Sequence, residues 1–164
     1  MLATDAVISE GEGTMLRTVL GIVLGVIAAT LLMLGLEALG MLLFPPPAGA
    51  APLSQADLAQ LVAVSSPAKL AWVVMGWALA SLIGGWVAAR IGRGHPRFAA
   101  LAIGVLITLG AVMNAMTIAH PAWMNLAGVV LPIPLALLGA RIARPRAAVA
   151  AAVVDAGNPP RPQQ

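Results

Sequence analysis

The chain has 164 residues, of which 60% are hydrophobic and 9% charged, and its mean hydropathy is +0.96. A water-soluble domain carries about 25% charged residues, so this composition excludes an ordinary soluble fold and indicates a membrane protein. The chain contains no cysteine, which excludes disulfides, thiol catalysis and thiolate metal sites. Its net charge of +3 does not indicate nucleic-acid binding, because the basic residues lie at the ends of apolar segments without interleaved aromatics.

The N-terminal part contains a polar leader and then the first apolar run. Residues 1–14 hold three acidic groups and no apolar periodicity, which predicts a disordered leader ahead of a membrane domain over 15–143. Met15 is a second natural start of translation, so the sequence fits a first residue at either Met1 or Met15. The run over 18–44 is long enough to span a hydrocarbon core of about 30 Å and too long for a cleaved signal peptide.

A loop over 48–67, predicted to lie outside, follows the three prolines that end the first span. Ser54 is a credible N-cap, and Asp57 stands at the favourable N3 position, where Glu or Gln would complete a capping box. Apolar residues recur after it, which predicts a short helix lying on the outer membrane interface. A helical lid without a function of its own is the alternative interpretation.

Three further spans are predicted over 70–89, 97–119 and 121–141, and a mobile cytoplasmic tail over 144–164. Pro132 and Pro134 lie inside the fourth span and predict a kink there. The fold class is therefore an all-α membrane protein, a bundle of four transmembrane helices with a short outer interfacial helix between helices 1 and 2.

The basic residues predict the orientation of the bundle. If the chain crosses four times, Lys69 lies on one side and all eight arginines lie on the other: Arg17, Arg90, Arg93, Arg97, Arg141, Arg144, Arg146 and Arg161. Short loops rich in arginine stay cytoplasmic, so both termini are expected inside. The excess of arginine and alanine favours a bacterial inner membrane. Contact with anionic lipid headgroups is expected at the cluster Arg141–Arg146.

Small residues recur at every fourth position in the spans, which places them on one helix face. Such faces let two helix backbones approach closely, and this packing replaces hydrophobic collapse within a bilayer. The predicted packing residues are Gly21, Gly25, Gly76, Ala80, Gly84 and Ala88. They indicate tight helix contacts, either within one chain or between chains.

Glu37 is the one carboxylate inside an apolar run, and an ionisable group within a membrane span is a functional candidate. Asn114, His120 and Asn125 fall at the same predicted outer level and complete a candidate ligand or proton site. A Glu37–His120 pair would form a proton-linked switch or a site for a cationic ligand. The alternative is that Glu37 is a solvated interfacial group and His120 only caps the fourth span.

The sequence contains no His-Glu-x-x-His zinc helix, no paired carboxylates within one span and no nucleotide loop. We therefore expect no enzyme activity, no metal and no cofactor. Over residues 15–143 the chain resembles, in architecture, the many small uncharacterised bacterial inner-membrane proteins with four spans. The stretch from Gly84 to Arg90, with its Gly84-Gly85-Trp86 start, is the most distinctive local feature of that resemblance.

The leading hypothesis is a non-enzymatic accessory or scaffold protein that packs in the bilayer with itself or with another membrane protein, and that binds no nucleic acid. The alternative is a small proton-coupled transporter or channel that uses Glu37. In plan the chain is similar to the small multidrug resistance transporters, four-helix dimers with an essential glutamate in the first helix. That resemblance implies Glu37 as the proton and drug-cation site and Trp77 as a wall. The chain departs from that family in the position of Glu37, which is too close to the outer end of the first span, in its long outer loop and in its lack of tyrosine.

Overall fold

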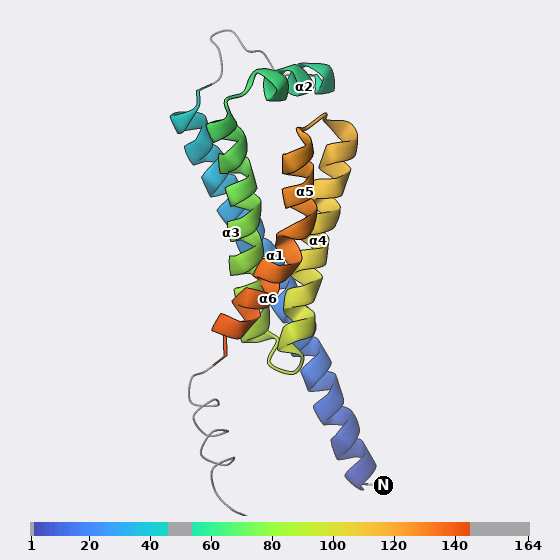
Figure 1. The fold of residues 1–164 in the computed structure, drawn as a ribbon. Coiled ribbons are helices and arrows are strands. Elements are labelled where there is room, and N and C mark those ends of the chain that lie inside the picture. Colours follow the sequence, from blue (N-terminus) through green and yellow to red (C-terminus); the bar gives the residue numbers. More distant parts are fainter. Residues whose placement is uncertain (1, 46–53, 145–164) are drawn as a thin grey trace, which may run out of the picture.

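The computed structural model describes residues 2–45 and 54–144. The elements in these ranges are all helices, and they are α1 (Leu2–Leu43), α2 (Gln55–Val64), α3 (Pro67–Ile91), α4 (Pro96–Thr117), α5 (Ala122–Val130) and α6 (Pro132–Ile142) (Figure 1). Four segments are long and apolar enough to cross a membrane, and they are Gly13–Leu43, Pro67–Ile91, Pro96–Thr117 and Ala122–Ile142. The predicted all-α bundle with four spans is confirmed.

The two ends of the bundle differ in what they carry. The start of α1, the α3–α4 connection and the end of α6 lie at one end, which we call the arginine end (Figure 1). Helix α2 lies across the opposite end, which we call the α2 end. The predicted mobile tail falls almost entirely on residues 145–164, outside the described ranges.

Helix α1 begins earlier than the sequence pattern predicts. The structure has helix from Leu2 onward, where a disordered leader over 1–14 is expected. No proline interrupts residues 2–14. Adding residues to an existing helix avoids the cost of nucleation, so the membrane span supplies a helical end from which the polar segment continues.

Helix α2 begins with a complete capping box. The Ser54 hydroxyl accepts from the Asp57 amide at 3.3 Å, and the Asp57 carboxylate accepts from the Ser54 hydroxyl at 2.6 Å and from its amide at 2.9 Å. The bond from the Ser54 hydroxyl lowers the pKa of the Asp57 carboxyl most, and the bond from the Ser54 amide lowers it further. Together they hold this pKa below its ordinary value of 3.8. Because this pKa is lowered, the capping box stabilises α2 fully at pH values above 3.8. Its contribution is lost as the pH falls further and the carboxylate takes up a proton.

The fourth span is divided at Leu131 into α5 and α6. Pro132 and Pro134 have no amide hydrogen, so the carbonyls of Gly128 and Val130 lose their usual donors and the helix breaks here. Pro132 is fully buried at the break. A Cβ on Gly104 of α4 would lie 2.8 Å from the Cα of Ile133, so α4 packs directly on the start of α6.

Helix α3 is the centre of the bundle, in contact with α1, α4 and α6. Its first packing face meets α1 through glycine and alanine. A Cβ on Gly21 would lie 2.6 Å from the carbonyl oxygen of Ala88, and one on Gly25 would lie 2.7 Å from that of Gly84. The α1 and α3 backbones therefore touch along the predicted small-residue faces.

A second face of α3 meets α6 in the same way. A Cβ on Gly85 would meet the carbonyl oxygen of Ala136 and lie 2.6 Å from its Cα. On the other side of the contact, a Cβ on Gly139 would meet the carbonyl oxygen of Leu82 and lie 2.7 Å from the Trp86 amide nitrogen. All four of these neighbouring atoms belong to the backbone, so they cannot rotate away as a side chain could.

The contrast between Gly85 and Gly35 provides a stability test. Nothing lies within 4 Å of a Cβ built on Gly35. We expect Gly85→Ala to separate α3 from α6 and to lower the free energy of unfolding by about 1–3 kcal/mol, as overpacking does. The matched control Gly35→Ala should not lower stability and should raise it by up to about 1 kcal/mol, because alanine favours the helix more than glycine does. The measurement is SDS-induced unfolding in mixed micelles, followed by circular dichroism. Equal midpoints for the two variants would show that the α3–α6 contact is not a close one.

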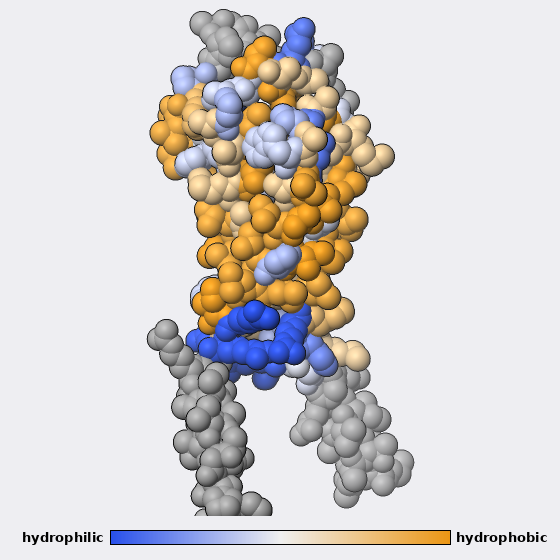
Figure 2. All heavy atoms as spheres, in the orientation of Figure 1, coloured by the Kyte–Doolittle hydropathy of each residue, from blue (hydrophilic) through white to orange (hydrophobic). Residues whose placement is uncertain are grey.

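The outer surface of the bundle is apolar. Large exposed side chains include Leu31, Leu34, Leu109, Met113 and Leu126. Figure 2 shows the resulting belt, with strongly hydrophilic side chains gathered at its lower edge. A belt of this kind requires lipid around it, so the chain is an integral, multi-pass membrane protein.

Candidate functional site

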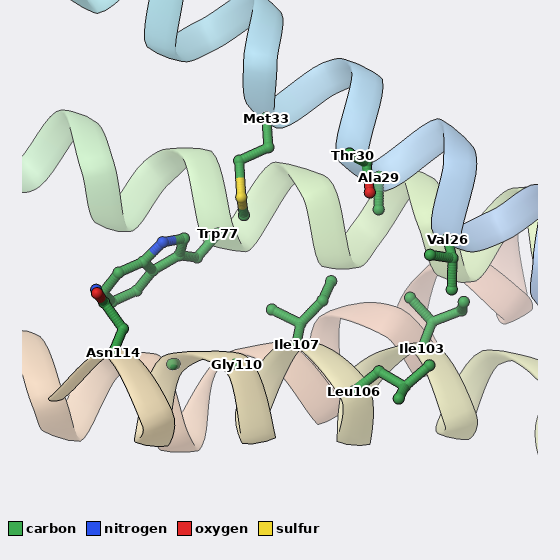
Figure 3. A pocket seen from close by; sticks show the side chains of 11 residues that line it. Val26, Ala29, Thr30, Met33, Trp77, Ile103, Leu106, Ile107, Gly110 and Asn114 are labelled. Atoms are coloured by element: carbon green, nitrogen blue, oxygen red, sulfur yellow. The ribbon is translucent and has the colours of Figure 1, made fainter. Parts of the chain in front are cut away.

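Helices α1, α3 and α4 meet tightly at one level and then leave an opening. At that level a Cβ on Gly84 would lie 2.9 Å from the Ala29 Cβ and 3.0 Å from the Ile103 Cγ2. Above it, toward the α2 end, lies a cavity of about 410 Å³, which we call the lateral groove. It is lined by Val26, Ala29, Thr30, Met33, Trp77, Ile103, Leu106, Ile107, Gly110, Ala111 and Asn114. Figure 3 shows it narrow at Val26 and Ile103 and wider toward Trp77 and Asn114.

Trp77 of α3 forms the wall at the wide end of the groove. Its ring lies between Met33 of α1 and Asn114 of α4 (Figure 3). Gly128 of α5 leaves room for the ring, since a Cβ there would lie 2.9 Å from the Trp77 Cζ3. Within the described residues, the indole N–H of Trp77 and the side-chain amide of Asn114 have no hydrogen-bond partner. An unpaired amide in hydrocarbon is costly, so both groups favour a polar occupant.

A second cavity of about 190 Å³ continues the lateral groove, and we call it the carboxylate pocket. It shares Met33, Trp77 and Asn114 with the groove and adds Leu36, Glu37, Trp72, Val73 and Gly76. The structure therefore brings Glu37 and Asn114 to one pocket, with two indole side chains in its lining. Glu37 is exposed and makes no ion pair with any described residue.

Trp72 positions the part of α1 that carries Glu37. Its indole N–H donates to the carbonyl oxygen of Leu36 at 3.0 Å. Gly40 provides the space, because a Cβ there would lie 2.9 Å from the Trp72 Nε1. The ring also lies against Phe44, with centroids 6.5 Å apart. The residue before Glu37 is thus tied to α3.

Two of the predicted site residues lie elsewhere. His120 lies in the α4–α5 connection, with its Nδ1 2.7 Å from the carbonyl oxygen of Ile118, and it does not line the carboxylate pocket. The interpretation of His120 as a cap is wrong, because Pro121 occupies the N-cap position of α5 and no side chain bonds there. Asn125 is half-buried on α5 and lines neither cavity.

The sequence pattern did not indicate the roles of Trp72 and Met33. Trp72 has the position expected of an interfacial aromatic, and a methionine in an apolar span carries no signal. Only the crossing of α1 over α3 brings Leu36 and Trp72 together, 36 residues apart. In the described ranges no group of three or more His, Asp or Glu side chains could hold a metal ion.

The chemistry of the combined site is that of cation recognition. Glu37 supplies a negative charge, and aromatic rings attract cations through their faces. Asn114 and the Trp77 indole add hydrogen-bonding groups, and the lateral groove adds apolar surface beneath them. The site suits a molecule with a cationic head and an apolar tail.

Replacement of Trp72 tests whether it positions the Glu37 segment. We expect Trp72→Phe, which keeps a ring but removes the bond to Leu36, to lower stability by about 0.5–1.5 kcal/mol. Hydrogen exchange should increase in α1 near residues 36–43. Trp123→Phe is the matched control, because Trp123 is half-exposed and has no bond within the described residues. Unchanged exchange in the Trp72 variant would contradict this role.

Comparison with known proteins supplies no further assignment. No family model, curated protein or solved structure matches the chain. The function proposed below therefore rests on the geometry of the lateral groove and the carboxylate pocket alone.

Proposed function

We propose that this protein binds amphiphilic cations from within the bilayer and works as a small non-enzymatic carrier or channel, in which Glu37 exchanges the cation for a proton. One observation supports the proposal above all: Glu37, Asn114, Trp72 and Trp77 line a single pocket. A solvated interfacial carboxylate would not need aromatic and amide neighbours from two other helices.

The continuity of the two cavities favours an amphiphile over a small ion. A cationic head would occupy the carboxylate pocket, beside Glu37 and the indole rings. An apolar tail would extend into the lateral groove, along Met33, Ile107 and Leu106 toward the bundle centre. This arrangement matches the depth order of the bilayer itself, in which heads lie near the interface and tails lie below.

Protonation would control release. A cation close to a carboxylate in a region of low dielectric is held far more strongly than in water. When the carboxylate takes up a proton, that attraction is lost and the head is free to leave. Glu37→Gln imitates the protonated form without changing the shape of the side chain.

Glu37→Gln is the direct test. In phosphatidylcholine nanodiscs, dodecyltrimethylammonium should change the tryptophan fluorescence of the intact protein with saturable binding. We expect Glu37→Gln to raise the dissociation constant at least 10-fold, equivalent to about 1.4 kcal/mol. Dodecanol, which has the same chain without the charge, should bind wild type and variant equally.

Asp57→Asn is the matched control for this test. It removes one carboxylate at the same end of the bundle from an exposed helix outside both cavities. It should leave the dissociation constant within 2-fold of wild type. If wild type shows no preference for the cation over dodecanol, or if Glu37→Gln binds as tightly as wild type, the carrier proposal is wrong.

The scaffold role is the second candidate, and an exposed glycine supports it. Nothing lies within 4 Å of a Cβ on Gly35 of α1, which lines neither cavity, so a partner helix could approach closely there. A scaffold predicts a stoichiometric complex in native mass spectrometry of gently extracted protein. That complex should be lost in Gly35→Leu and retained in Glu37→Gln. The carrier predicts the opposite for cation binding, which Gly35→Leu should leave unchanged and Glu37→Gln should weaken.

The proposed setting is a bacterial inner membrane with both termini in the cytoplasm, as the arginine distribution favours. The cysteine-free chain allows a direct test. Gln60→Cys, on α2, should react with an impermeant maleimide on intact cells. His95→Cys, in the α3–α4 connection, should react only after permeabilisation. The reverse pattern would place the arginine end outside.

A further inference from the structure

A third cavity lies at the arginine end, remote from the carboxylate pocket. It has a volume of about 250 Å³ and is lined by Ala89, Arg90, Arg93, Pro96, Ala140, Ala143 and Arg144. We call it the arginine pocket. Its three arginines come from separate segments: Arg90 from the end of α3, Arg93 from the α3–α4 connection and Arg144 from the second position beyond α6. Figure 2 shows strongly hydrophilic side chains around a hollow at this end, directly below the apolar belt.

Arg90 gives the pocket a defined wall. Its Nη1 donates to the carbonyl oxygen of Ala143 at 3.1 Å, which ties the end of α6 to α3. The guanidinium has five N–H donors, so this one bond leaves the others available. The side chains of Ala89, Ala140 and Ala143 are buried and form an apolar floor. The pocket is therefore part of a packed helix junction, since its floor and one of its arginines belong to the α3–α6 contact.

Three guanidinium groups line the arginine pocket. Neither of the two carboxylates whose side chains the structure describes, Glu37 and Asp57, forms an ion pair with them. The positive-inside rule places basic residues in the loops at this end of the spans. It is satisfied by arginines anywhere in those loops, whether or not they lie close to one another. It does not explain why three arginines from separate segments line one cavity, where their mutual repulsion is unfavourable unless an anion lies between them.

We propose that the arginine pocket binds the phosphate headgroup of an anionic phospholipid such as phosphatidylglycerol. Arginine forms paired hydrogen bonds with phosphate oxygens, and its weak hydration favours this contact at an interface. Pro96 begins α4 at the rim of the pocket, so the positive end of that helix dipole adds to the attraction.

The position of the pocket favours a lipid over a soluble phosphate. It opens at the boundary of the apolar belt, which is the depth at which a phospholipid holds its phosphate (Figure 2). The acyl chains of such a lipid would lie on the exposed apolar surface above it. Basic pockets between membrane helices are suited to anionic headgroups for this reason.

Lipid titration of the full-length protein tests the proposal. Native mass spectrometry in phosphatidylcholine nanodiscs with increasing phosphatidylglycerol should show one tightly retained phosphatidylglycerol per chain. We expect the double variant Arg93→Ala/Arg144→Ala to weaken its retention at least 10-fold. Arg90 is left intact because it holds α6. Arg93→Lys/Arg144→Lys keeps the charge but loses the paired geometry, and it should fall between wild type and the alanine variant.

The matched control is Arg17→Ala/Arg97→Ala, which removes the same charge from exposed arginines outside the pocket. It should reduce retention less than 2-fold. An equal loss in both double variants would mean a diffuse charge effect and would overturn the proposal. So would equal retention of phosphatidylcholine, or displacement of the lipid by millimolar inorganic phosphate, which would identify a site for a soluble anion. A circular dichroism spectrum of each variant confirms that it is folded.

Discussion

The close backbone contact of α3 with its neighbours is the constraint on which the rest of the structure depends. In lipid, each helix satisfies its own backbone hydrogen bonds, and no hydrophobic force drives one apolar helix against another. Association therefore depends on how closely the backbones approach. Gly84 and Ala88 let α1 come near, and Gly85 lets α6 come near on a second face. The other helices are arranged around α3.

This contact is not uniform along the bundle. Toward the arginine end, small residues on α1, α3, α4 and α6 allow close packing. Toward the α2 end, larger side chains separate the helices, and α1 leaves α4 while it stays on α3 through Trp72. The lateral groove and the carboxylate pocket result from this divergence, and Trp77 fills part of the space against Gly128. The candidate site therefore follows from a change in residue size along the same helices that form the bundle.

The two ends of the molecule offer opposite chemistry. The carboxylate pocket presents Glu37 with aromatic and amide neighbours, and the arginine pocket presents three guanidinium groups. The carboxylate pocket is lined by residues of the spans themselves, and the arginine pocket lies at their opposite ends. The two proposals accordingly assign an amphiphile with a cationic head to the first pocket and one with a phosphate head to the second. Charge and depth together distinguish the two sites, whereas the apolar surface between them is common to both.

The sequence by itself determined the membrane class, the four spans, the capped helix α2 and the break at Pro132. Each of these follows from local chemistry: apolar length, an N-cap serine, and a proline without an amide hydrogen. It also singled out Glu37 and Asn114 as candidates, because a polar group within an apolar run is visible without any structure. It placed His120 and Asn125 with them because all four share a predicted depth, but depth does not specify the direction in which a residue faces.

Only the tertiary structure decided which of these groups meet. The crossing of α1 over α3 sets Leu36 against Trp72, and the packing of α3 against α4 and α5 sets Trp77 beside Asn114 and Gly128. The convergence of Arg90, Arg93 and Arg144 likewise depends on how α6 returns to α3. These contacts join residues far apart in the chain. Their geometry depends on the angles at which the helices cross. Close packing of small residues on two different helices sets these angles, and the residue pattern within one segment does not encode them.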